Sequence, residues 1–288
     1  MRNKLSVSKV LIVTAVALLA LLCLLPILLV LMTSFASERS ITANGYTLWP
    51  KEWTTEAYRQ LINPASRVFP AYWTTIRVTV IGSVLATLMT YGAGYTLSNP
   101  QCRYREGLAL FFFIPMVFTA GLIPWYMMNK NLGLYDNLWA LIVPSLMFSP
   151  FNMFLTRNFL RGIPESLRES AMIDGAGDLR ISLQIYAPLA KPVIATITLF
   201  YAVAYWNDYM NGVLLINSAN QQPLQLLLFN IQSELSMISQ MMVGVEITPP
   251  KESFKMATSI ITIGPIIILY PLLQRHFIKG MVIGAVKG

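Results

Sequence analysis

Few side chains in the long apolar stretches of this chain could take part in catalysis or bind a metal ion. Asp208 is the single acid within these stretches, and the single histidine, His276, lies beyond the last of them with no cysteine or carboxylate at metal-ligand spacing. Catalysis usually requires paired carboxylates, a metal constellation or an activated nucleophile. One alternative is a membrane-embedded glycosyl- or lipid-transferase, but the apolar stretches offer no second catalytic group to act with Asp208.

Nucleotide hydrolysis also lacks its usual signature. No G-x-x-x-x-G-K-[ST] phosphate-binding loop is present, and no lysine of the chain is followed by serine or threonine. The chain therefore does not bind ATP by that route. We expect a protein that is not an enzyme, with no cofactor and no metal.

The composition predicts that the elements around these residues lie in a membrane. Of the 288 residues, 55% are hydrophobic and 12% are charged, whereas soluble domains carry about 25% charged residues. Because a spanning helix needs roughly 20 apolar residues, we expect an all-α polytopic protein. The six predicted spans are 10–32, 72–97, 108–128, 138–160, 193–216 and 256–273.

The orientation of these spans follows from the basic residues that flank them. With a cytoplasmic N-terminus, thirteen of the 21 Lys and Arg residues lie inside, seven lie outside, and Arg77 lies within the second span. This bias and anionic lipid explain the net charge of +8 without nucleic acid. We therefore expect both termini on the cytoplasmic side of the cytoplasmic (inner) membrane.

This topology divides one transmembrane domain, residues 1–288, into segments on the two sides. Residues 1–9, 161–192 and 274–288 are expected inside, and 33–71 and 217–255 outside. The outer segments are each long enough for one or two short helices that pack on the membrane domain or on an external partner. The methionines of the second, Met237, Met241 and Met242, are typical of core or interface packing.

The inner segment 161–192 predicts a short helix, a glycine break and a second helix. Pro164 suits a first helical turn, Gly175 permits a positive φ, and Asp178 is a candidate cap for the second helix. Small and partly apolar residues share one face of the first helix: Leu167, Ser170, Ala171 and Asp174. Such a helix either seats in a partner's groove or lies on the membrane surface, and the residues alone favour neither.

The same segment resembles the EAA loop of permease subunits from binding-protein-dependent ABC importers. The family pattern is E-A-A, two variable residues, D-G-A, about eight more, and I-x-L-P. Its positions are matched in register by Glu169, Ser170, Ala171, Asp174, Gly175, Ala176, Ile185 and Pro188. Ser170 replaces the second alanine, and Ala187 replaces the leucine before the proline, which are mild departures.

Further segments resemble the carbohydrate-importing, maltose-type group of this family. They are Gly121–Tyr126, Asn131–Leu134, Arg157–Phe159, Trp206–Asp208, Glu252–Ala257 and Gly284–Gly288. Several of them resemble a subgroup that handles larger, sometimes uronate-containing, oligosaccharides. The resemblance covers most of the chain and implies the type I importer permease fold, with a cytoplasmic coupling helix.

The resemblance implies that transport is shared among several partners. They are a second permease subunit, a dimer of nucleotide-binding ATPase subunits, an extracytoplasmic solute-binding protein and an oligosaccharide substrate. Glu169 would pair with a basic group of the ATPase, Gly175 would form the turn, and Ala171 and Ala176 would permit close approach. Lys287 and Gly288 resemble the permease tail that reaches the ATPase interface, although a solvated end is an equal alternative.

Four residues are candidates for the translocation path. Asp208 is an ionisable residue at membrane depth, and Asn207 and Trp206 beside it offer the hydrogen-bonding and aromatic groups that suit sugars. For Trp206 an interfacial belt position is favoured slightly over the path. Arg77 is expected to snorkel or to pair structurally, with Asp208 or an acidic sugar as other partners. The alternative to ATP-driven import is an ion-coupled secondary carrier, for which more intramembrane acids would be expected.

Overall fold

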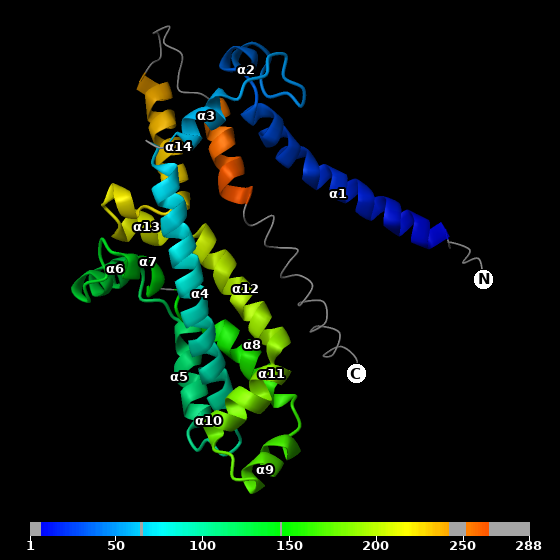
Figure 1. Ribbon diagram of the computed structural model, residues 1–288, viewed down its shortest axis with the longest axis vertical. Helices are drawn as coiled ribbons and strands as arrows, with labels where there is room; N and C mark the ends of the chain where they lie inside the picture. Colours follow the sequence, from blue (N-terminus) through cyan, green and yellow to red (C-terminus); the bar gives the residue numbers. More distant parts are fainter. Residues whose placement is uncertain (1–6, 64–65, 145, 242–251, 265–288) are drawn as a thin grey trace. The chain divides into compact units, whose positions relative to one another are not determined.

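The structure, a computed structural model, describes residues 7–63, 66–144, 146–241 and 252–264. These residues form helices and loops, and their strand-like pairing is limited to one isolated bridge between Ala36 and Trp53. The predicted helical class is thus confirmed for the described residues. The chain divides into two compact units, residues 1–68 with 228–264 and residues 69–227 with 265–288. Each unit is described by itself (Figure 1).

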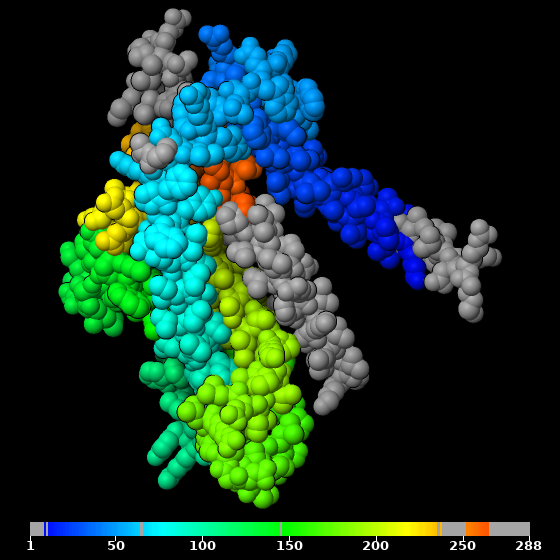
Figure 2. Space-filling view, in the orientation of Figure 1, coloured from blue at the N-terminus to red at the C-terminus, as the bar shows by residue number. Residues whose placement is uncertain are grey.

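The first unit begins with α1 (Val7–Ser34), which contains the predicted span 10–32. Its segment Leu11–Ser34 has a mean hydropathy of 3.1, and none of the most apolar 18 residues in this segment is buried. The side chains of residues 11–28 are exposed, and Figure 2 shows this part of α1 (dark blue) uncovered in the view. Because 24 residues rise about 36 Å, this helix is long and apolar enough to cross a membrane.

Two short helices follow α1, as predicted for the outer segment. Ser37 caps α2 (Glu38–Asn44) through its hydroxyl, which accepts the Ser40 N–H, and Gly45 ends the helix at φ 69°. α3 (Glu56–Ile62) contacts the end of α1, where the Tyr58 ring stacks on Phe35 at 4.7 Å. The carboxylate of Glu38 accepts hydrogen bonds from the backbone and hydroxyl of Ser253, which joins α2 to the helix over residues 252–264.

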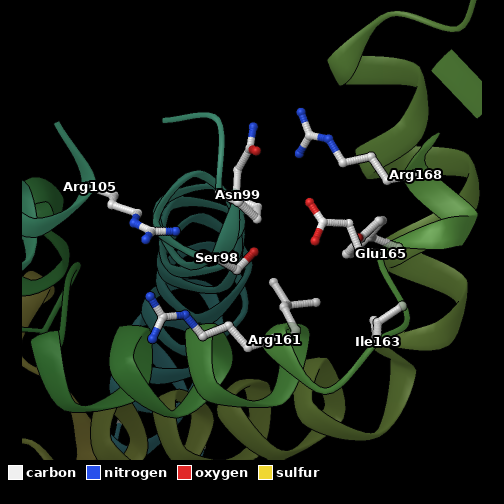
Figure 3. Close-up of a pocket in the computed structure, with 10 residues that line it drawn as sticks. Ser98, Asn99, Arg105, Arg161, Ile163, Glu165 and Arg168 are labelled. Carbon is white, nitrogen blue, oxygen red and sulfur yellow. The ribbon is translucent and has the colours of Figure 1, made fainter. Parts of the chain in front are cut away.

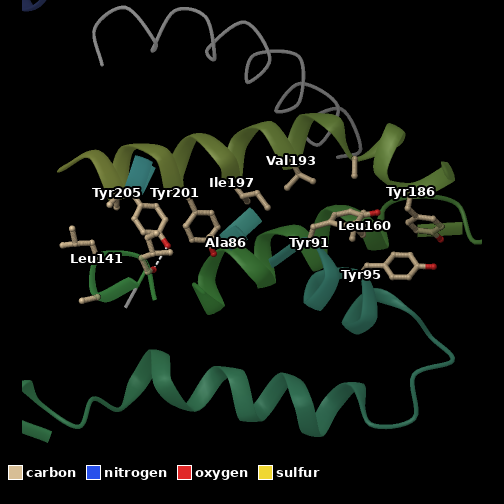
Figure 4. Packing of buried hydrophobic residues seen from close by; sticks show 14 of the residues in the cluster. Ala86, Tyr91, Tyr95, Leu141, Leu160, Tyr186, Val193, Ile197, Tyr201 and Tyr205 are labelled. Carbon is tan, nitrogen blue, oxygen red and sulfur yellow. Dashed lines mark hydrogen bonds between the residues drawn. The ribbon is translucent and has the colours of Figure 1, made fainter. Parts of the chain in front are cut away.

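The second unit is organised around α4 (Val68–Ser98), which contains the predicted span 72–97. Its described neighbours are α5 (Arg105–Val117), α8 (Pro150–Arg161) and α12 (Lys191–Asn207). The buried cluster between them includes Ala86, Leu160 and Ile197, which are each at most 1% exposed (Figure 4).

Tyrosine hydroxyls complete this core rather than interrupt it. The Tyr201 hydroxyl pairs with Thr90 at 2.6 Å and accepts the Ser149 N–H, while Tyr205 donates to the Ile142 carbonyl at 2.8 Å. A buried hydroxyl without a partner would cost free energy, so these bonds are what allow tyrosine to occupy the helix interfaces.

Three predicted spans are wrong as single continuous helices. The span 108–128 breaks after α5, because Gly121 adopts φ 85° and α6 (Leu122–Asn131) leaves at a bend of 117°. The span 138–160 is divided into α7 (Leu138–Ile142) and α8, because Pro150 starts a new helix capped by Ser149.

The span 193–216 also breaks. α12 ends at Asn207, and α13 (Met210–Leu215) begins after two non-helical residues. Residues 256–264 of the sixth predicted span are helical, and the remainder lies outside the described residues. Two described helices meet the criteria for crossing a membrane by themselves, Leu11–Ser34 and Val68–Ser98, and up to four do if each bent pair forms one span.

The second outer segment forms longer helices than expected. After a single turn at Ala219–Gln221, α14 (Leu224–Met241) runs for 18 residues. Of the predicted methionine cluster, Met237 is exposed on α14. Met242 lies outside the described residues, and the side chain of Met241 does as well.

Two loops near the ends of α6 and α13 are joined by one carboxylate. Asp136, which adopts φ 50°, accepts hydrogen bonds from the Asn217 and Ser218 backbone and from the Ser218 hydroxyl at 2.6 Å. The hydroxyl bond is the largest cause that lowers the pKa of Asp136 below its ordinary value. Since the folded state lowers this pKa, the carboxylate stabilises the junction above the ordinary carboxyl range and loses that contribution as the pH falls through the lowered pKa.

We expect acidification to open this junction before the helices melt. The hydrogen-exchange protection of the Ser218 amide, corrected for intrinsic rates, should be constant between about pH 8 and pH 5 and fall below about pH 4. Asp136→Asn should show weaker protection at neutral pH, with no titration across this range. Equal protection in the two proteins at neutral pH would contradict the role of the carboxylate.

Candidate functional site

The predicted helix–glycine–helix segment lies at one end of the second unit (Figure 1). α9 (Ser166–Ile173) ends in a tight turn in which Gly175 adopts φ 78° and the Ala176 N–H bonds back to the Ala171 carbonyl at 2.9 Å. The predicted helix and the positive φ of Gly175 are therefore confirmed. A Cβ built on Gly175 meets no atom within 4 Å, so glycine is needed here for its backbone conformation and not for space.

The second helix of the segment is irregular. α10 (Asp178–Ile181) continues into a π-helical turn, Ser182–Tyr186, and then into α11 (Ala187–Leu189), before α12 starts at Lys191. The candidate motif residues Ile185 and Pro188 lie in the π-turn and in α11. π-turns are rare and occur often at functional sites.

The prediction that Asp178 caps the second helix is wrong. Gly177 is the residue before α10, with no side-chain cap, and Asp178 lies in the first turn. Its carboxylate instead forms an ion pair with Arg168 of α9. The side chain of Arg168 is only 3% exposed, and removal of the acid would leave this buried charge uncompensated. The pair therefore fixes α9 against α10 across the glycine turn.

Two tyrosines of α4 attach this segment to the transmembrane core. Tyr91 donates its hydroxyl proton to the Ser182 carbonyl at 2.7 Å, and Tyr95 donates to the Asp178 carbonyl at 3.3 Å. The ring of Tyr95 also meets that of Tyr186 edge to face at 5.3 Å. These contacts hold α10 and the π-helical turn directly against α4.

Sequence reasoning missed Arg168, Tyr91 and Tyr95 as parts of the site. The available signal was the i, i+4 spacing of the two tyrosines, which places both on one face near the end of α4. No local signal identifies the partner of Arg168, because its depth depends on how α9 packs.

The predicted docking face is oriented differently from the sequence pattern. Of its four residues only Ala171 is buried, at 8% exposure, and it packs in the chain's own core cluster, which the partly buried Ala176 also contacts. Glu169, Ser170 and Asp174 are exposed. The close approach that Ala171 permits is thus to the chain itself.

The outer surface of this segment instead carries large apolar side chains around the glycine turn. Ile173 is 86% exposed and Leu179 is 74% exposed. Burial of such a side chain is worth about 1.5–3 kcal/mol, so a partner that covers both would gain appreciable free energy.

The four candidate residues for the translocation path lie in different environments in the structure. Trp206 is buried and its ring meets Tyr72 at 6.4 Å, edge to face. Asn207 is exposed and accepts a hydrogen bond from Gln225. Arg77 is exposed and lies over the ring of Trp73 on its own helix at 5.7 Å.

Asp208 occupies the break between α12 and α13. One of its carboxylate oxygens accepts the backbone N–H of Asn211 at 3.3 Å, in the manner of an N-terminal cap of α13. Asn211 itself is buried and donates to the Pro144 carbonyl. Asp208 therefore holds the position of Asn211. Among the described residues, Asp208 forms no ion pair with Arg77.

A cavity of about 280 Å³ lies at these helix breaks. Its lining combines an aromatic ring, an amide and apolar side chains: Thr119, Gly121, Leu122, Trp125, Met210, Asn211 and Leu214. Trp125 and Asn211, which are far apart in the sequence, both line this cavity. An aromatic face with a few polar groups matches the chemistry of a sugar.

Other predicted residues lie outside the described residues, namely Lys287, Gly288 and His276. Within the described part of the chain, no group of three or more His, Cys, Asp or Glu side chains is arranged to hold a metal ion.

Comparison with known proteins identifies the family of the whole chain. Residues 6–283 match the family of binding-protein-dependent transport system inner membrane components. The chain is 37% identical over 257 residues to the polygalacturonan/rhamnogalacturonan transport system permease protein YtcP of Bacillus subtilis (strain 168), covering 88% of this chain and 89% of that protein. It is also 37% identical to the protein LplC of the same organism, covering 88% and 86%.

The fold agrees as well. A chain in the crystal structure of a bacterial ABC transporter involved in the import of the acidic polysaccharide alginate superposes with a TM-score of 0.82 and 32% sequence identity, over 94% of this chain and 98% of that chain. The match of nearly the whole sequence, together with the helix–glycine–helix segment, assigns the chain to a family of transport subunits and not of enzymes. The protein belongs to the binding-protein-dependent transport system inner membrane component family, the permease subunits of ABC importers.

Proposed function

We propose that this chain is one of two permease subunits of an importer that carries an acidic oligosaccharide across the cytoplasmic membrane. The observation that carries the proposal is the segment α9–α10, whose glycine turn displays Ile173 and Leu179 to a partner. The relatives are named for polygalacturonan, rhamnogalacturonan and alginate, which favours a uronate-containing substrate. Family membership also favours ATP-driven import over an ion-coupled carrier.

The topology proposed for this function has six spans in a single domain, residues 1–288, with both termini in the cytoplasm. Three of the spans are broken helices, which the ends of α5, α7 and α12 within these ranges support. Segments 33–71 and 217–255 face the extracytoplasmic binding protein, and 161–192 forms the cytoplasmic coupling loop. The basic residues inside the cell exceed those outside, which supports this orientation.

Coupling is proposed to act through a nucleotide-binding ATPase dimer. Ile173 and Leu179 provide apolar contact, and the exposed carboxylate of Glu169 pairs with a basic group of the ATPase. Movement of α9 passes through the Arg168–Asp178 pair and the α4 tyrosines to the transmembrane core. Lys287 and Gly288 are proposed to contact the ATPase interface.

The cavity at the helix breaks is proposed as part of the translocation path. Trp125 would stack on a sugar ring, and Asn211 would hydrogen-bond to its hydroxyls. The breaks support this role, because irregular backbone at membrane depth is tolerated where it lines a cavity. Asp208 then acts by holding Asn211 in position.

The experiment that tests the function is purification of this chain in mild detergent after expression with its genetic neighbours. We expect a second permease and an ATPase to co-purify and to hydrolyse ATP. Stimulation of that hydrolysis by binding protein and uronate oligosaccharides would identify the substrate class. A chain that purifies alone, with no hydrolysis in the eluate, would refute the proposal.

Whether the negative charge of Asp208 contributes to transport, beyond its hold on Asn211, is tested by Asp208→Asn. Because asparagine still accepts the Asn211 N–H, the break between α12 and α13 should persist while the charge is lost. We expect the KM or rate of uptake in proteoliposomes to change, with an unchanged yield of assembled complex. Glu106→Gln, which removes one charge from an exposed acid outside both the cavity and the coupling segment, serves as the control. Unaltered uptake kinetics in Asp208→Asn would assign the residue to structure alone.

A further inference from the structure

A second cavity, of about 380 Å³, lies beside α9 and is unlike the one at the helix breaks. Three of its lining residues are arginines and one is an acid: Arg105, Arg161, Arg168 and Glu165. Figure 3 shows Arg105 and Arg161 on one side of the cavity and Arg168 with Glu165 on the other. Its volume falls within the range of about 300–1,000 Å³ that is usual for small-molecule sites.

The basic groups of this cavity are incompletely paired. Within the described part of the chain, Arg105 and Arg161 form neither an ion pair nor a side-chain hydrogen bond. Arg168 pairs with Asp178 through one terminal nitrogen, but its buried Nε has no hydrogen-bond partner among the described residues. Such a group costs free energy unless a ligand satisfies it.

A fourth arginine strengthens the positive field. Arg157 interacts electrostatically with Arg105 and Arg161, and its Nε is likewise buried without a partner in the described residues. Glu106, also within electrostatic range, and Glu165 offset part of this charge. Guanidinium groups that converge in this way repel one another, and an anion between them would offset that repulsion.

The position of the cavity indicates which kind of anion would reach it. Its walls are the last residues of α4 (Ser98), the first of α5 (Arg105) and the last of α8 (Arg161). In the proposed topology these are the cytoplasmic ends of three neighbouring spans, at the depth of the lipid headgroups. Basic pockets between helices on this side suit anionic headgroups, and guanidinium groups bind phosphate oxygens in bidentate fashion.

We propose that this cavity binds the phosphodiester headgroup of an anionic phospholipid from the cytoplasmic leaflet. The inference rests on the orientation in the proposed function. Arg105 and Arg161 hold the phosphate, Arg168 contributes its unpartnered Nε, and Glu165 opposes the anion. Since Arg168 also fixes α9 to α10, the bound lipid stabilises the coupling segment in one position.

The test measures lipid retention by the purified complex with native mass spectrometry, during titration with phosphatidylglycerol or phosphatidylcholine. We expect the wild-type complex to retain phosphatidylglycerol preferentially. Arg105→Gln/Arg161→Gln should weaken it roughly 25-fold, because each basic residue near a membrane surface contributes about fivefold in affinity. Glu165→Gln should strengthen binding, since the opposing carboxylate is removed.

Matched variants separate this site from general surface charge. Arg103→Gln/Arg180→Gln removes two exposed arginines of the same predicted side, neither of which lines the cavity. This control should bind phosphatidylglycerol like the wild type, and equal losses in the two double variants would overturn the proposal. Should the cavity double variant fail to assemble, Arg105→Gln alone and Glu165→Gln, with opposite expected signs, decide the question.

Two further measurements distinguish a bound lipid from other possible ligands of the cavity. Displacement of bound lipid by millimolar inorganic phosphate would show a site for free phosphate and would overturn the lipid assignment. Loss of the lipid when the ATPase subunits join the permeases would show that an acidic ATPase residue fills the cavity instead. A complex that assembles and hydrolyses ATP but does not prefer phosphatidylglycerol refutes the lipid site and leaves the proposed function intact, whereas absence of the ATPase refutes the function itself.

Discussion

Gly175→Val is expected to abolish most substrate uptake while the complex continues to assemble and hydrolyse ATP. Gly175 adopts φ 78°, a conformation in which an L-residue with a branched Cβ collides with its own backbone. The cost is about 1–2 kcal/mol or more, and the turn relieves it by changing the direction of α10 relative to α9. Because docking and the Arg168–Asp178 pair both depend on this direction, uptake should fall roughly tenfold or more.

The neighbouring Gly177 provides a matched control for this prediction. It lies two residues away with φ −74° and ψ 161°, an extended conformation that valine adopts readily. A Cβ at either glycine meets no atom within 4 Å, so the two substitutions differ in backbone strain alone. Gly177→Val should therefore retain uptake, and Gly175→Asn should retain much of it because asparagine tolerates a positive φ.

The measurement is uptake per ATP hydrolysed in proteoliposomes that contain the complete complex. Normal coupling in Gly175→Val would show that the turn has no role in docking. Equal loss in Gly175→Val and Gly177→Val would show that the surface, and not the turn geometry, is what the ATPase requires.

Gly94→Val is expected to produce a large loss of stability. Gly94 is buried where α4 crosses α8, and its added Cβ would lie 2.8 Å from the Thr156 methyl and 3.3 Å from the Arg157 backbone nitrogen. Backbone cannot move aside as a flexible side chain does, so the helices must separate. Overpacking of this kind costs about 1–3 kcal/mol, and small residues are what permit close helix contacts in membranes.

Gly92 on the same helix is the control for the helical backbone. It is exposed, and a Cβ there meets nothing within 4 Å. Thermal unfolding of the purified chain in mild detergent should show a clear decrease in melting temperature for Gly94→Val and little change for Gly92→Val. Equal melting temperatures for the two variants would contradict the close contact between α4 and α8.

The spans show how far hydropathy alone predicts this fold. The ranges 10–32 and 72–97 agree with α1 and α4, because a long uniform apolar run specifies a helix of that length locally. The breaks in 108–128, 138–160 and 193–216 were not predicted, because they are set by local turns and caps at Gly121, Ser149 and Asp208. Gly121 and Pro150 were visible in the sequence, but glycine and proline also occur inside continuous membrane helices.

The coupling segment was also predicted only in part. The spacing of Glu169, Ala171 and Gly175 was sufficient to predict a helix, a positive-φ turn and a second helix. The face that the first helix buries was not predicted, because a short helix with small residues on one side packs in whichever orientation its neighbours allow. Ala171 was therefore assigned to a partner, although it contacts the chain's own core.

By itself the sequence determined that the protein lies in a membrane, is helical, shows no G-x-x-x-x-G-K-[ST] phosphate-binding loop, and carries a segment that resembles the family's coupling motif. These properties follow from composition and from spacing within a few residues, which are local. Only the tertiary structure decided that Asp178 binds Arg168, that Asp208 holds Asn211 at a cavity, and that arginines from α5, α8 and α9 converge. Those pairings join residues from different helices or across a turn, and their geometry is set by packing that no local pattern encodes.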